Sequence, residues 1–228
     1  MGALITAIRD ALAAGANPER AAGQQRYMKS AMPFRGLTAP ELTLALHPIL
    51  AAERLPDAPT WRSTAQTLWD EAGYREERYA AIAVLRHRSY REWARDPQPE
   101  LVTLLRHLIV TGAWWDLVDV LASHCVGNLL RARPDVMTPL LRQWAVDPDL
   151  WLRRTAILSQ LSSKQTTDTA LLRDAIAGST DDPDFFARKA IGWALREFSK
   201  TDADWVRRYL TQHPELSPLS QREARRSL

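Results

Sequence analysis

Residues 98–131, QPELVTLLRHLIVTGAWWDLVDVLASHCVGNLLR, decide the fold class of this chain. Apolar side chains recur there at positions i, i+3, i+4 and i+7, as in the four leucines of LVTLLRHL. That spacing places them on one face of an α-helix, because the helix turns once in about 3.6 residues. Gly112 interrupts the pattern. The stretch therefore predicts two amphipathic helices, over residues 98–110 and 114–131.

The same pattern continues in both directions, broken by short Pro, Gly and Asp segments. Helix pairs recur at roughly 35 to 40 residues without a strict repeat, which is typical of degenerate HEAT-like repeats. We therefore expect an all-α fold, a HEAT-like helical-repeat solenoid with a concave face, as one domain over 1–228. The other predicted helices span residues 3–15, 24–31, 39–52, 60–72, 75–88, 138–146, 148–162, 167–177, 183–198, 202–211 and 218–226.

Several helix starts carry recognisable signals. Thr38 and Glu41 form a capping-box pattern, in which each side chain satisfies a free backbone amide of the first turn. Three Asp-Pro pairs predict an Asp cap followed by Pro at the first helical position. These pairs lie at residues 96–97, 147–148 and 182–183.

Composition limits the class of protein. The 228 residues carry a net charge of only +3, although arginine far outnumbers lysine. Simple solubility and a polyanionic partner both fit that balance. Cys125 is the single cysteine, so neither an internal disulfide nor a cysteine-based zinc site is expected, and no histidine pair has metal-ligand spacing. With no signal peptide or long apolar run, a cytoplasmic protein without membrane attachment is expected.

The segment at residues 111–119, TGAWWDLVD, is the strongest local signal for chemistry. Trp115 and Asp119 are four residues apart and share one helix face, whereas Trp114 is turned about 100° away. An indole and a carboxylate on one face suit a cationic ligand. A tryptophan at a helix–helix seam beside a solvated aspartate is the simpler alternative.

Two further helices and one loop carry candidate residues. Arg154 projects from an apolar stripe and needs a partner, either a phosphate or Asp119, unless it is an ordinary surface arginine. Gly192, beside Trp193, indicates close approach of another backbone or a ligand, or simply tight helix packing. The polar loop at residues 162–167 is either a solvated turn or a phosphate contact through Lys164.

Taken together, these segments resemble the AlkD-type family of DNA alkylation repair glycosylases, from about residue 24 to the end of the chain. Six strings in the right order and separation make the resemblance specific. They are YMK at 27–29, LWDE at 68–71, WWD with VD at 114–119, WL with Arg154 at 151–154, KAIGWALRE at 189–197, and PLS with REA at 218–224.

The resemblance implies a concave face that holds duplex DNA and a hydrolytic reaction on cationic N3- and N7-alkylated purines, without base flipping. It implies that Asp119 is the catalytic carboxylate, that Trp115 and Trp193 face the lesion, and that Arg154 is the active-site arginine. We further expect a monomeric, monofunctional glycosylase of base excision repair that needs no cofactor or metal. The expected DNA contacts are Arg154, Lys164, Lys189 and Tyr27. The alternative is a non-catalytic HEAT-like module that binds DNA structures or protein.

Overall fold

The computed structural model describes residues 2–228, and within that range the regular structure is entirely helical, with no strand. By its internal contacts the chain divides into two compact units, Met1–Ala94 and Arg95–Leu228, which are described separately. The helices of the first unit are α1 Gly2–Ala14, α2 Pro18–Met28, α3 Ala39–Ala52, α4 Ala58–Asp70 and α5 Arg75–Arg86. Those of the second are α6 Pro99–Gly112, α7 Trp115–Val120, α8 Gly127–Ala132, α9 Pro134–Trp144, α10 Leu150–Leu158, α11 Thr169–Ala177, α12 Phe185–Ser199, α13 Ala203–Gln212 and α14 Pro218–Ala224.

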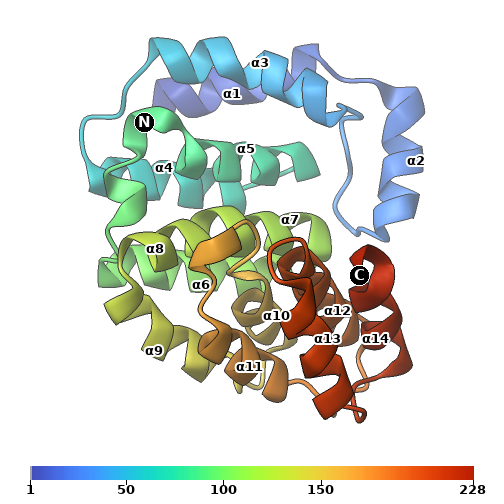
Figure 1. Cartoon of the computed structure of the whole chain (residues 1–228). Coiled ribbons are helices and arrows are strands. Elements are labelled where there is room, and N and C mark those ends of the chain that lie inside the picture. Colours follow the sequence, from blue (N-terminus) through green and yellow to red (C-terminus); the bar gives the residue numbers. More distant parts are fainter. Residues whose placement is uncertain (1) are drawn as a thin grey trace. The chain divides into compact units, whose positions relative to one another are not determined.

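In the first unit, α1, α3, α4 and α5 pack on one another (Figure 1). The carboxylate of Glu76 accepts backbone N–H groups from Arg35, Gly36 and Leu37, which fixes the loop before α3. Helix α2 differs from the others because none of its residues is buried. The expected range 24–31 for this helix was wrong at both ends, because the helix begins at Pro18, after the Asn17 cap, and ends at Met28.

In the second unit, the helical run from α7 to α8 and the helices α10, α12 and α14 pack one on the next in chain order, and we call them the stacked layer. Helix α7 continues through a π-helical segment, Leu121–Val126, into α8, and α10 packs on both α7 and that segment. Helix α12 packs on α10, and α14 packs on α12 (Figure 1). Outside the stacked layer, α9 packs on α11. Helices two apart along the chain therefore pack on each other, as the neighbouring units of a helical-repeat fold do.

The all-α class expected from the sequence is confirmed, and the stacking of alternate helices is that of a helical-repeat solenoid. A single domain over 1–228 and a concave DNA-binding face stay predictions. No helix in the described part of the chain has the length and apolar character needed to cross a membrane.

The expected helix starts were partly wrong. The capping box is confirmed, with Thr38 accepting the Glu41 N–H and the Glu41 carboxylate accepting the Thr38 N–H. The Asp-Pro pairs do not cap, because each helix begins later, with Gln98, Asp149 and Asp184 at the cap positions. In the second and third pairs, the aspartate forms a turn before the helix instead. Asp147 accepts the N–H of Asp149 at 2.9 Å, and Asp182 accepts that of Asp184 at 2.8 Å.

The glycine in α12 is explained by helix packing. A Cβ added at Gly192 would lie 2.5 Å from Cβ of Glu223 and 2.8 Å from the backbone oxygen of Ser220. Helix α14 therefore lies directly against the backbone of α12, so of the alternatives left open by the sequence, tight packing of another backbone holds.

We expect Gly192→Ala to lower the free energy of unfolding by about 1–3 kcal/mol, because the new methyl group overpacks the α12–α14 contact. Urea denaturation followed by circular dichroism measures the change. Gly23→Ala on α2 is the control, since its Cβ would meet nothing within 4 Å. That variant should be neutral or more stable by up to about 1 kcal/mol, as alanine is the better helix former. Equal stability of Gly192→Ala and the wild type would contradict the packing explanation.

Candidate functional site

A buried ion pair joins α7 to α10. The Arg154 guanidinium donates from Nε to Oδ1 of Asp119 at 2.7 Å and from Nη2 to Oδ2 at 2.8 Å. Its Nη1 donates to the backbone oxygen of Phe186 at 2.6 Å. Only 3% of the Arg154 side chain and 13% of the Asp119 side chain are exposed. Of the two partners that the sequence left open for Arg154, the structure therefore shows the carboxylate.

The electrostatics of this pair are set by burial. Burial raises the pKa of the Asp119 carboxyl above its ordinary value, and the hydrogen bonds and charge of Arg154 oppose that rise. The neighbouring charge of Asp116 adds to it. Asp119 is thus a carboxylate removed from most of the solvent and fixed in orientation by a two-point arginine contact, which is a strong and directional form of hydrogen bonding.

An aromatic cluster lies beside the ion pair. The ring centroid of Phe186 is 5.2 Å from that of Trp114 and 5.1 Å from that of Trp151, and Cζ of Arg154 lies 5.9 Å from the Phe186 ring. The Phe186 ring gives the guanidinium an apolar neighbour, and a charge in apolar surroundings is weakly screened. Sequence reasoning missed Phe186. Phe186 contributes its backbone carbonyl to the ion pair, and every residue type has such a carbonyl, so the sequence does not indicate this role.

The two tryptophans expected at the site are both half-buried. Trp115 opens α7 one turn before Asp119, and Trp193 lies on α12 with Cζ of Arg196 5.8 Å from its ring. Because α10 packs on both α7 and α12, the expected site residues occupy three adjoining helices of the stacked layer. The structure thus brings Asp119 and Arg154 into direct contact. Trp115 lies on the helix of Asp119, and Trp193 lies on α12, which packs on the helix of Arg154.

Lys189 takes part in a second charged cluster. Its Nζ lies 2.8 Å from Oε1 of Glu223, and Arg196 and Arg226 lie 3.4 Å and 3.1 Å from the same carboxylate. The Lys189 hydrogen bond is the main cause that holds the pKa of Glu223 below its ordinary value. This cluster ties α14 to α12 around a single buried glutamate. The DNA contact expected for Lys189 stays a prediction, and the structure gives the side chain a structural partner.

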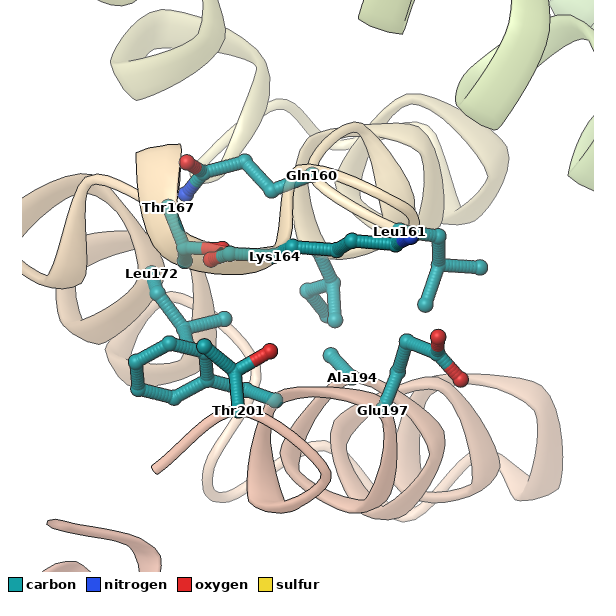
Figure 2. Close-up of a pocket in the computed structure, with 10 residues that line it drawn as sticks. Gln160, Leu161, Lys164, Thr167, Leu172, Ala194, Glu197 and Thr201 are labelled. Carbon is teal, nitrogen blue, oxygen red and sulfur yellow. Dashed lines mark hydrogen bonds between the residues drawn. The ribbon is translucent and has the colours of Figure 1, made fainter. Parts of the chain in front are cut away.

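Lys164 and Tyr27 are exposed and lie apart from the ion pair in the chain. Lys164 begins a short 3-10 helix with a backbone φ of 49° and lines a hollow between α10 and α12 together with Gln160 and Glu197 (Figure 2). Asp119 does not line that hollow. Tyr27 belongs to α2 of the first unit, with 73% of its surface exposed. The DNA contacts expected for both residues stay predictions.

Within residues 2–228, no three His, Cys, Asp or Glu side chains come together in a group suited to a metal ion. The charged groups of the site are instead paired with each other, Asp119 with Arg154 and Glu223 with its three basic neighbours.

Two matches with known proteins bear on the family of this chain. A family model described as DNA alkylation repair enzyme matches residues 8–228. The chain is also similar to a solved structure from Enterococcus faecalis, described as a predicted DNA alkylation repair enzyme. The two are 30% identical, with a TM-score of 0.83 over 93% of this chain and 96% of that one. A comparison with curated proteins found no match.

Proposed function

This chain belongs to the DNA alkylation repair enzyme family, and from that membership we propose that it is a monofunctional DNA glycosylase. The proposed substrate is duplex DNA with a cationic N3- or N7-alkylated purine, such as 3-methyladenine, 7-methylguanine or a bulkier N7 adduct. The proposed reaction is hydrolysis of the bond between base and sugar, which leaves an abasic site for base excision repair.

The buried Asp119–Arg154 pair is the observation that carries the proposal. Cleavage of an N-glycosidic bond passes through an oxocarbenium-like sugar, as other glycoside hydrolyses do. A carboxylate in poorly solvated surroundings stabilises such a developing cation more strongly than one in water. Arg154 uses one hydrogen-bonding position on each oxygen of Asp119, and a carboxylate offers about four such positions in all. The remaining positions are available to the sugar or to the attacking water.

In this proposal Arg154 is a positioning residue, because its guanidinium is engaged by Asp119 and by the Phe186 carbonyl. Trp115 and Trp193 pack against the sugar and add cation–π stabilisation. A phosphate contact by Arg154, and DNA contacts by Lys164, Lys189 and Tyr27, remain part of the proposal. The lesion stays stacked in the duplex, which departs from the base flipping of most glycosylases.

A non-catalytic module that binds DNA structures or protein is the alternative. The buried ion pair favours the enzyme. A scaffold gains little stability from a buried pair, because removing two charges from water costs about as much as their attraction returns. Base release from an alkylated duplex separates the two functions, since only the enzyme produces a free base.

We expect efficient release of 7-methylguanine and of a bulky N7-alkylguanine, and no release of uracil from the same duplex. A cationic purine leaves as a neutral molecule, so the enzyme has to stabilise only the sugar cation, for which Asp119 supplies the charge. Uracil would leave as an anion, and the proposed site holds no general acid to protonate it. Chromatography of the released bases measures the outcome. Efficient uracil release, or failure on every cationic adduct, would overturn the proposed reaction.

A further inference from the structure

The helix that carries Asp119 has an irregular register directly after that residue. Leu121–Val126 is π-helical, and the Gly127 N–H donates to the backbone oxygen of Ala122, five residues earlier. The Ser123 hydroxyl donates to the backbone oxygen of Asp119 at 2.6 Å. The π segment thus begins two residues after the catalytic candidate, and the Ser123 side chain supplies an additional donor to the Asp119 carbonyl. Such π-bulges are rare and occur frequently at functional sites.

Two points on this helix face α10. The first is Asp119, through its two hydrogen bonds to Arg154. The second is Gly127, where an added Cβ would lie only 2.6 Å from the backbone oxygen of Ser159, the residue that caps the C-terminus of α10. Only a glycine permits this approach, because any side chain at that position would collide with a backbone atom that has little freedom to move.

In a regular α-helix, Asp119 and Gly127 would not lie on the same face. Eight residues separate Asp119 from Gly127, which in a regular α-helix leaves them roughly 80° apart around the axis. A π-bulge absorbs one additional residue, so the spacing behaves as seven residues and the difference falls to roughly 20°. The π segment therefore turns the carboxylate and the close-contact glycine onto one face.

We propose that the π segment Leu121–Val126 and Gly127 are a positioning device that sets the register of α7 on α10, so that Asp119 meets Arg154 in a two-point contact. The Gly127–Ser159 contact fixes the distance between the two helices and the rotation of the first one. At the other end of that helix, this placement brings Asp119 within hydrogen-bonding distance of Arg154. The catalytic consequence rests on the proposed glycosylase function. The placement of the carboxylate against Arg154 does not.

The test compares Gly127→Ala with the wild type in two measurements. An NMR titration of the Asp119 carboxyl should show a higher pKa in the variant, because a displaced Arg154 no longer opposes the effect of burial. The other charge acting on this carboxyl is Asp116 of the same helix. Arg106, on the neighbouring α6, lies 3.6 Å from Asp147 instead. Single-turnover release of 7-methylguanine should fall about a hundred-fold, as expected for a misplacement of the order of 1 Å, and its acid limb should move to higher pH.

Gly178→Ala is the matched control. Its Cβ would lie 2.1 Å from the backbone oxygen of Ala145, a comparable collision in the same unit but with a different partner. It should lower stability and leave both the Asp119 titration and the rate per folded molecule unchanged. An unchanged titration in Gly127→Ala, or the same change in both variants, would overturn the register proposal. A wild type that releases no cationic base would overturn the glycosylase function instead, and the titration would still decide the register.

A deletion offers a second variant in case Gly127→Ala does not fold. Removing His124, an exposed residue of the π segment, should convert the segment into regular α-helix with the same seven-residue spacing. We expect the deletion variant to keep the wild-type titration of Asp119. A folded deletion variant in which that titration has shifted would contradict the phase argument.

Discussion

Asp119→Asn is expected to lower the rate of base release by about 10² to 10³, equivalent to about 3–4 kcal/mol of transition-state stabilisation. The amide keeps the shape of the side chain and removes the negative charge aimed at the sugar cation. Affinity for undamaged duplex should change little, because that affinity depends on contacts to the phosphate backbone. Single-turnover kinetics with excess enzyme and a 7-methylguanine duplex measure the effect.

Asp119→Asn should also lower the stability of the protein. Arg154 is buried against Asp119, so the substitution leaves a guanidinium charge without its partner. Breaking a buried pair on one side destabilises a protein by about 3–5 kcal/mol. The assay therefore belongs well below the melting temperature of the variant. Asp116→Asn on the same helix is the control and should retain base release. If Asp116→Asn loses activity and Asp119→Asn keeps it, the catalytic carboxylate is Asp116.

Arg154→Met is expected to be among the most destabilising single changes in the chain, by about 3–5 kcal/mol, because it strands a buried carboxylate. The pKa of Asp119 should rise further above its ordinary value, since the group that opposes the effect of burial is gone. Base release should then require a higher pH than in the wild type, because the active form is the carboxylate. Urea denaturation and the pH profile of the single-turnover rate measure the two effects.

A double variant separates stability from catalysis. Arg154→Met combined with Asp119→Leu removes both charges and fills the site with apolar side chains, and such replacements are often neutral or stabilising. We expect the double variant to recover most of the lost stability and to release no base. Additive losses of stability in the double variant would show that the two residues do not act as a pair. Activity in the double variant would remove both residues from the reaction.

Much of the fold follows from local sequence. The 3.6-residue apolar period predicts the helices from α3 onward to within a few residues, because the buried stripe of each helix is written in its own side chains. Helix starts were less certain. In the string Asp147-Pro148-Asp149 either aspartate can cap, and the sequence does not show that the first one closes a turn while the second one caps the helix. Local hydrogen bonds of similar strength compete at such positions.

The candidate site divides along a similar line. The sequence by itself determined the all-α class, the helix face shared by Trp115 and Asp119, and the residues on which a family resemblance could rest, because each of these depends on neighbours within one or two turns. Only the tertiary structure decided that Arg154 pairs with Asp119, that the Phe186 carbonyl completes the contact, and that Gly192 and Gly127 admit other backbones. Each of these contacts joins residues that lie about thirty positions apart in the sequence. They depend on how two helices rotate and approach one another, and that geometry is set by packing over the whole layer.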